Sequence, residues 1–286
     1  MQVQTKNPKK HKVKAGYGKT ALGVFVSIMF AFMILPSLMT IPMSFSDTKY
    51  LVFPPKGFTL KWFYTFITDE TWLDPALLSL KLAIMVTLLS VTLGTLASMA
   101  LVRGKLPFKK TVSIFLISPM MIPGIIIAFA VYGLYAKLRL IGSLFGLVLA
   151  HTVIATPFVI LIINASLYRF DINLERAARN LGANALKTFF FVTLPLIKPG
   201  MISAVVFAFI TSMDEVVLTL FLIGTKQKTL PIKIFTQIQW FIDPMVAAAS
   251  TLFIAASIFV VITLGLLQKG ESKKQFSKEQ KDEFSS

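Results

Sequence analysis

Leu174-Glu175-Arg176-Ala177-Ala178-Arg179-Asn180-Leu181-Gly182-Ala183 is a short polar stretch between two long apolar segments, and the rest of the chain is organised around it. Its apolar residues follow the spacing i, i+3, i+4 and i+7, which places them on one face of a helix. They are Leu174, Ala177, Ala178 and Leu181. Because two of the four are alanine, the face is shallow and another surface can approach the helix backbone closely. The stretch therefore predicts a docking helix.

The residues that flank this stretch predict where the helix begins and ends. Asp171 stands just ahead of it, where a carboxylate can accept hydrogen bonds from the free amides of the first turn. Gly182 follows the last apolar position, where a helix can end in a left-handed residue. Glu175, Arg176 and Arg179 take the remaining faces. Together these signals bound a helix of about three turns.

The composition identifies an integral membrane protein. The chain has 286 residues, of which 55% are hydrophobic and only 15% charged, and its mean hydropathy is +0.75. These values lie outside the range of soluble domains. The net charge of +16 does not indicate nucleic acid, because the basic residues stand in short connectors rather than on one accessible surface.

Six apolar segments are long enough to cross a bilayer as helices. They run approximately over residues 21–45, 77–102, 111–135, 142–168, 200–224 and 245–267. Pro119, Pro123 and Gly124 predict a bend in the third span. The domain organisation that follows is a basic tail over 1–20, a six-helix transmembrane domain over 21–267 and a polar tail over 268–286.

The distribution of basic residues predicts which side of the membrane each connector occupies. An even number of spans places both termini on one side. If that side is the cytoplasm, 20 Lys and Arg residues lie inside and 8 outside, with Lys81 in its span. This excess agrees with the positive-inside rule. The topology puts the docking helix, between the fourth and fifth spans, in the cytoplasm.

The stretch also resembles a known family motif. Ala177-Ala178, then Gly182, then Leu194-Pro195 resemble the EAA loop of permease subunits in binding-protein-dependent ABC importers. The glutamate of that motif falls on Arg176, with Glu175 one position earlier, so the role of the carboxylate is open in this chain.

The resemblance implies an all-helical integral membrane protein of the type I ABC importer permease fold, located in the bacterial inner membrane. It implies that the docking helix is a coupling helix, which contacts a cytoplasmic ATPase subunit. The implied coupling residues are Leu174, Glu175, Arg176, Ala177, Ala178, Leu181 and Gly182. The implied partners are a second permease subunit, two ATPase subunits and a periplasmic solute-binding protein. ATP and Mg²⁺ belong to the ATPase subunits, so the chain itself is not an enzyme and has no cofactor.

Asp214 and Glu215 are the only acidic residues within the predicted spans. A carboxylate in lipid costs a few kcal/mol, so such residues line a cavity or pair with a partner. The surrounding Ser212-Met213-Asp214-Glu215-Val216-Val217 resembles the fifth span of spermidine/putrescine-type permeases. We therefore expect a substrate pathway at these two residues and a small organic cation, such as a polyamine, as the substrate. Related permeases for other small organic solutes share much of the pattern.

Other functions have less support. Residues 171–195 could form an ordinary amphipathic helix at the membrane surface. Asp214 and Glu215 could instead serve an ion-coupled carrier that works alone, but no inverted repeat is apparent. The chain has no cysteine and two histidines, so no set of residues indicates a metal site or a catalytic triad. We expect His151, inside an apolar span, to be a hydrogen-bonded packing residue.

Overall fold

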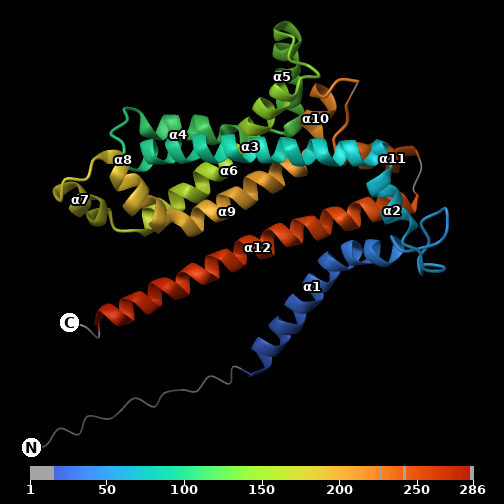
Figure 1. The fold of residues 1–286 in the computed structure, drawn as a ribbon, viewed down its shortest axis with the longest axis horizontal. Helices are drawn as coiled ribbons and strands as arrows, with labels where there is room; N and C mark the ends of the chain where they lie inside the picture. Colours follow the sequence, from blue (N-terminus) through green and yellow to red (C-terminus); the bar gives the residue numbers. More distant parts are fainter. Residues whose placement is uncertain (1–15, 226, 241–242, 284–286) are drawn as a thin grey trace, which may run out of the picture.

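The computed structural model describes residues 16–225, 227–240 and 243–283, and these residues form helices and short connections without a strand (Figure 1). Most of the predicted basic tail, residues 1–15, lies outside this range. The elements are α1 Gly16–Met43, α2 Lys61–Thr68, α3 Glu70–Val102, α4 Lys109–Ile117, the 3₁₀ turn η1 Ser118–Met121, α5 Gly124–Leu138, α6 Leu144–Arg169, α7 Ile172–Asn180, α8 Ala185–Thr188, the π-helical turn η2 Phe189–Thr193, α9 Leu194–Met213, α10 Val217–Leu222, α11 Leu230–Trp240 and α12 Pro244–Glu283.

Five of the described helices are long and apolar enough to cross a membrane on their own. They cover Lys19–Met43, Glu70–Val102, Leu144–Arg169, Ala185–Met213 and Pro244–Thr263. A sixth crossing is possible if Lys109–Met121 and Gly124–Leu138 count as one span, bent by 102°.

This bend lies where the prolines predict it. Pro123 has an extended backbone between η1 and α5, so the helix cannot continue through it. As a result α5 points away from α3, α6 and α9 and packs against α10 (Figure 1).

The core consists of α3, α6 and α9, which pack side by side. Small residues bring these helices together. A methyl group on Gly94 of α3 would come within 2.5 Å of Val159 Cγ1 on α6, and one on Gly200 of α9 would collide with the Ser166 hydroxyl of α6. In lipid, close backbone approach of this kind replaces hydrophobic burial as the main source of helix association.

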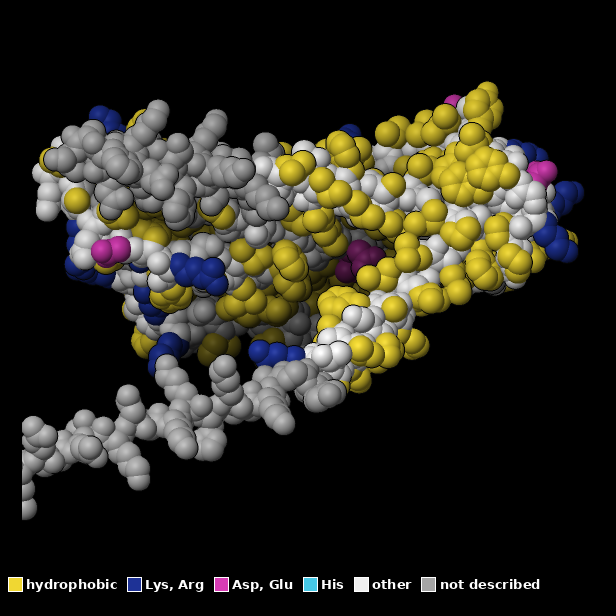
Figure 2. Space-filling model, turned by 90° about the horizontal axis from the view of Figure 1, so that it is seen from below, with side chains coloured by type: hydrophobic (Ala, Val, Ile, Leu, Met, Phe, Trp, Pro, Cys, Tyr) yellow, Lys and Arg dark blue, Asp and Glu magenta, His cyan; other side chains and the backbone are white. Residues whose placement is uncertain are grey.

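The first and last helices lie to one side of this core, where α12 contacts α9. In Figure 1, α1 and α12 run below the α3–α6–α9 group, and they contact each other. No residue in the most apolar window of α1 is buried. Its apolar side chains are therefore available to lipid or to another chain. Hydrophobic side chains cover much of the middle of the molecule, and Lys and Arg gather mainly toward its two ends (Figure 2).

The fifth span differs from the prediction. The sequence predicts residues 200–224, but the apolar helix covers Ala185–Met213 and the chain then breaks at 214–216 before α10. Pro195 does not interrupt this helix, because it stands in the first turn of α9, directly after the π-helical turn η2. Asp214 therefore caps the end of α9 and does not lie in mid-helix.

Candidate functional site

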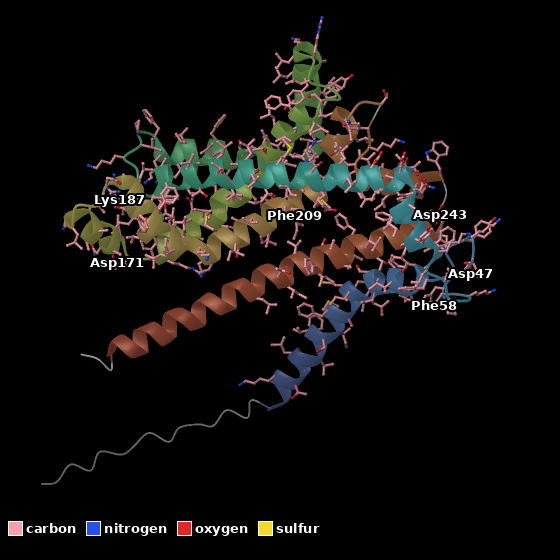
Figure 3. The ribbon with its side chains drawn as sticks, viewed as in Figure 1. Asp47, Phe58, Asp171, Lys187, Phe209 and Asp243 are labelled. Carbon is pink, nitrogen blue, oxygen red and sulfur yellow. The ribbon has the colours of Figure 1, made fainter. Side chains whose placement is uncertain are left out.

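Both predicted ends of the docking helix are present in α7. The Asp171 carboxylate accepts a hydrogen bond from the Asn173 amide at 2.9 Å and caps the first turn. Gly182 follows the helix with φ of +89°, a left-handed conformation that strains other residues. Figure 3 places Asp171 of this region, with Lys187, at one end of the molecule and Asp47, Phe58 and Asp243 at the other.

The predicted apolar face of α7 points outward. Leu181 is 90% exposed and Leu174 is 48% exposed, although both are large hydrophobic residues. Ala177 is exposed and Ala178 is half-buried. Arg176 is also exposed, and its guanidinium donates to Asn173 Oδ1 at 3.3 Å. The face is thus available to a partner, and its two alanines leave the backbone accessible.

Glu175 has the opposite orientation and is only 4% exposed. Its Oε1 atom accepts a hydrogen bond from Thr193 Oγ1 at 2.9 Å and lies 3.3 Å from Arg103 Nε. The sequence groups Glu175 with the coupling residues, but its side chain faces the body of the protein. It is placed to anchor α7, while the residues on the opposite face are placed to contact a partner.

Arg103, at the end of α3, completes this anchor. Its Nη2 atom donates to the Leu167 carbonyl at 3.0 Å, and its guanidinium lies 4.6 Å from the centre of the Phe170 ring. The ends of α3 and α6, the helix α7 and the turn η2 therefore meet at one buried ion pair. Sequence reasoning counted Arg103 only as a basic connector residue, because nothing local marks its partner 72 positions away.

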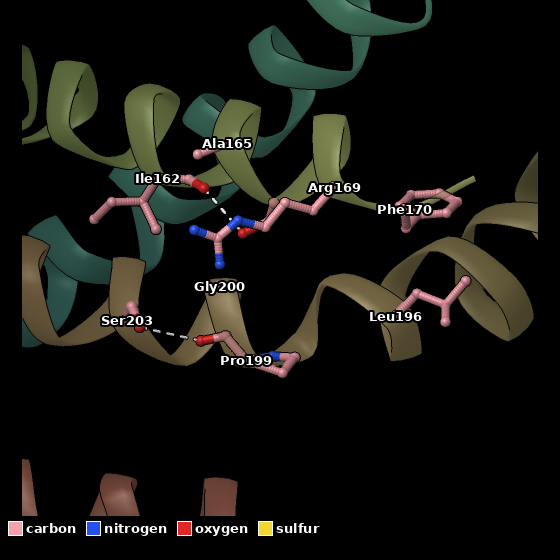
Figure 4. Close-up of a pocket in the computed structure, with 9 residues that line it drawn as sticks. Ile162, Ala165, Arg169, Phe170, Leu196, Pro199, Gly200 and Ser203 are labelled. Atoms are coloured by element: carbon pink, nitrogen blue, oxygen red, sulfur yellow. Dashed lines mark hydrogen bonds between the residues drawn. The ribbon is translucent and has the colours of Figure 1, made fainter. Parts of the chain in front are cut away.

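A hollow lies beside this anchor, between α6 and α9 (Figure 4). It has a volume of about 500 Å³ and is lined by residues that include Arg169, Phe170 and Gly200. In Figure 4 the Arg169 guanidinium extends over Gly200. The Ser166 hydroxyl that faces the hollow donates to the Ile162 carbonyl. We assign no ligand to this hollow.

The two acidic residues lie together at the break between α9 and α10, but their carboxylates have different surroundings. Asp214 is exposed and lines a hollow of about 280 Å³. The other lining residues are Val216, Pro231, Ile234, Phe235, Ile238, Ser250, Phe253 and Ile254, most of them from α11 and α12. Figure 2 shows acidic atoms at the bottom of a depression rimmed by hydrophobic side chains.

The Glu215 carboxylate instead caps α10. Its Oε1 atom accepts a hydrogen bond from the Leu218 amide at 2.7 Å. This bond satisfies one of the free amides in the first turn of α10, where a negative charge also interacts favourably with the helix dipole. Of the two predicted pathway residues, Asp214 is therefore available to a substrate and Glu215 stabilises the backbone.

His151 of α6 is buried and hydrogen-bonded, as the sequence predicts. Its Nδ1 atom lies 3.1 Å from Ser212 Oγ, and its Nε2 atom lies 2.9 Å from Thr219 Oγ1. Ser212 precedes the break and Thr219 follows it. The sequence does not reveal this connection, because the two partners are more than 60 positions away.

Long apolar helices, a short helix with an exposed apolar face and a hollow lined by a carboxylate are typical of a multi-pass membrane transport protein. Comparison with protein families narrows this class. Residues 90–271 match the family described as "Binding-protein-dependent transport system inner membrane component", and the chain belongs to this family. The matched residues include both α7 and the break that carries Asp214.

Individual relatives cover most of the chain. It is 28% identical to the spermidine/putrescine transport system permease protein PotC of Escherichia coli (strain K12), over 90% of this chain and 97% of the relative. It is 30% identical to the putrescine transport system permease protein PotI of the same strain, over 88% of this chain and 92% of the relative.

Solved structures support the fold. A chain from a bacterial ABC transporter involved in the import of the acidic polysaccharide alginate matches with a TM-score of 0.68 at 16% identity, over 92% of this chain and 99% of that one. A chain from the alginate transporter in complex with its pentasaccharide-bound periplasmic protein matches with a TM-score of 0.70 at 14% identity, over 88% of this chain and 93% of that one. At these identities the likeness concerns the fold alone.

Proposed function

We propose that this chain is a permease subunit of an ATP-driven importer and that its substrate is a polyamine such as spermidine or putrescine. The names of the relatives that cover about nine-tenths of the chain support this substrate class. The observation that carries the proposal is the Asp214 carboxylate in an otherwise largely apolar hollow.

The chemistry of the hollow fits an aliphatic diamine or triamine. An ammonium group forms a charge-assisted hydrogen bond with a carboxylate such as that of Asp214. Phe235 and Phe253 line the same hollow, and aromatic faces attract cations. Ile234 and Ile238 offer apolar contacts to the methylene chain between the amines. An anionic solute would be repelled by the same carboxylate.

The outward face of α7 is proposed to contact a cytoplasmic ATPase subunit, through Leu174, Ala177, Ala178 and Leu181. In the complete importer a second permease subunit pairs with this chain, two ATPase subunits bind ATP and Mg²⁺, and a periplasmic solute-binding protein delivers the substrate. Both termini are then cytoplasmic. The 90% exposure of Leu181 supports this assignment, because the burial of an exposed leucine side chain by a partner stabilises the complex.

Reconstitution of the complete importer in liposomes tests the proposal. ATP-dependent uptake of labelled spermidine or putrescine, which requires the solute-binding protein, is the expected result. Omission of ATP and of the solute-binding protein are the two controls. ATP-dependent uptake of a neutral or anionic solute, without uptake of either polyamine, would contradict the substrate assignment and leave the permease assignment intact.

One further relative suggests a second substrate. The chain is 28% identical to the putative 2-aminoethylphosphonate transport system permease protein PhnV of Salmonella paratyphi A, over 77% of this chain and 83% of the relative. This compound shares an ammonium group with the polyamines and adds an anionic phosphonate. An assay of whether unlabelled 2-aminoethylphosphonate competes with labelled polyamine for uptake distinguishes the two substrates. The negative charge of Asp214 favours the polyamine.

A further inference from the structure

The break between α9 and α10 forms without a helix-breaking residue. Ser212-Met213-Asp214-Glu215-Val216-Val217 contains neither proline nor glycine, and a continuous helix would be the simpler structure in lipid. Backbone N–H and C=O groups that lose their helical partners at a break in the membrane need other hydrogen-bond partners. Each group left without one costs several kcal/mol. Side chains must therefore hold this break open.

Four polar side chains do so. Glu215 Oε1 accepts from the Leu218 amide, and the Thr219 hydroxyl donates to the Glu215 carbonyl at 2.9 Å. His151 of α6 then reaches both sides of the break, through Ser212 in the last turn of α9 and Thr219 in α10. Its side chain is completely buried.

The hydrogen bonds fix the role of each ring nitrogen. The single proton of the Thr219 hydroxyl is used in the hydrogen bond to the Glu215 carbonyl, so the hydroxyl oxygen accepts a hydrogen bond from the Nε2–H group of His151. In a neutral ring Nδ1 is then the acceptor, and the Ser212 hydroxyl donates to it. Both partners are uncharged, so a neutral imidazole satisfies the whole set. A charged ring here would be buried without a carboxylate partner among the residues that the structure describes.

The helix beyond the break is itself held in place. The Gly142 amide, in the connection before α6, donates to the Leu222 carbonyl of α10 at 2.8 Å. Gly142 and Gly224 approach so closely that a methyl group on Gly224 would lie 3.1 Å from the Gly142 Cα atom. Since α10 is fixed in this way, the bond from His151 to Ser212 determines how the end of α9 meets it. Asp214 lies between these two points.

We propose that His151 is a positioning residue, a neutral clasp across the break that keeps Asp214 directed into the hollow between the break, α11 and α12. The inference rests on the proposed role of Asp214 in the substrate pathway. A residue that only fills space could be replaced by an apolar ring of similar size. A clasp requires one donor and one acceptor on the same side chain.

The chain has no cysteine, so a single introduced thiol can report on the hollow. Ser250 lines the same hollow as Asp214 and differs from cysteine by one atom. In the complete importer carrying Ser250→Cys, we would measure the modification rates by a cationic thiol reagent and by a neutral one of similar size. Asp214→Asn is expected to lower the cationic-to-neutral ratio roughly fivefold, as for a partly exposed charge pair.

His151→Phe is expected to lower this ratio to the same extent, and His151→Gln, which keeps a donor and an acceptor, to retain most of it. Combining His151→Phe with Asp214→Asn should cause no further fall, because both act through one carboxylate. Thr219→Val and Thr219→Ser form a matched pair in which only the serine keeps the hydroxyl. If His151→Phe does not insert into the membrane, the comparison of Thr219→Val with Thr219→Ser tests the inference instead.

Either of two results would overturn the inference. The first is a wild-type cationic-to-neutral ratio in both His151→Phe and Thr219→Val, with both variants folded. The second is a further fall of this ratio when His151→Phe is combined with Asp214→Asn. Failure of the proposed function gives a different pattern. If spermidine and putrescine do not protect the thiol from modification while the variants still change the ratio as described, the substrate is wrong and the clasp is correct.

Discussion

The two ends of α9 are each held by a buried polar cluster, and the two clusters differ in charge. At the start of α9, Thr193 donates to Glu175, which pairs with Arg103. At its end, Ser212 bonds to His151. Thr193 and Ser212 are 19 positions apart in the sequence, which corresponds to about 28 Å along a helix, so one helix links the docking region to the acidic hollow.

The difference follows from the distance of each cluster from water. The Arg103 side chain retains 13% of its exposure and lies where helices end, so its charge keeps part of its hydration. His151 has no exposure and lies within an apolar span. A charge costs several kcal/mol at such a site even when paired, whereas hydroxyl and neutral imidazole groups satisfy one another at lower cost.

This contrast indicates different mechanical roles. The ion pair connects α7 to the ends of α3 and α6 and, through Thr193, to the turn that leads into α9. The neutral cluster spans a break, where a change of backbone direction is already present. Motion imposed on α7 would thus pass along α9 and change the geometry at the break, where Asp214 lies.

The largest effect is expected from breaking the ion pair. Glu175→Ala leaves Arg103 without its counter-charge, which costs on the order of 3 kcal/mol for a buried pair and frees Thr193 as well. We expect ATP-dependent uptake in the reconstituted importer to fall more than tenfold. Basal ATPase activity and membrane insertion should fall much less, because α7 keeps its own cap and its exposed face.

A charge exchange is the control for this prediction. The double variant Arg103→Glu with Glu175→Arg restores opposite charges at the same positions and should recover part of the uptake that either single variant loses. Double-mutant analysis of uptake gives the coupling between the two residues. Equal and additive losses would show that the pair does not act as a unit.

The next effect concerns the outward face of the same helix. Leu181→Asp places a charge on a position that is 90% exposed in the chain alone, so the fold should tolerate it. If an ATPase subunit covers this face, the buried charge should reduce co-purification of the ATPase and lower uptake about tenfold. Leu181→Met keeps an apolar side chain and is the matched control. Normal ATPase binding and uptake in Leu181→Asp would refute the docking role.

Sequence reasoning predicts the local features of these regions well. Asp171 and Gly182 mark the ends of α7 because caps depend on residues a few positions apart, and Pro123 marks the bend before α5 for the same reason. Helical periodicity predicts that the apolar residues of α7 share one face, and the exposure of Leu174 and Leu181 shows that this face points outward.

Features that depend on distant residues are not predicted. Hydropathy extends the fifth span to residue 224, because it counts apolar residues and does not detect the side-chain bonds that break the helix after Met213. From the sequence alone, Arg103 is one more basic residue in a connector between two spans. The different roles of Asp214 and Glu215 are not predicted either, because they depend on which carboxylate accepts a hydrogen bond from a backbone amide and which one lines the hollow.

The smallest effect, and the sharpest test at the far end of α9, compares these two neighbouring acids. Asp214→Asn removes the charge from the hollow and should lower polyamine uptake about fivefold, the scale of one partly exposed charge-assisted contact. Glu215→Gln keeps an oxygen that can accept from the Leu218 amide, so uptake should change less than about twofold. The measurement is the initial rate of ATP-dependent uptake at a saturating concentration of solute-binding protein. Glu215→Leu, which removes the cap, should instead lower thermal stability. A larger loss of uptake in Glu215→Gln than in Asp214→Asn would reverse the assignment of the two carboxylates.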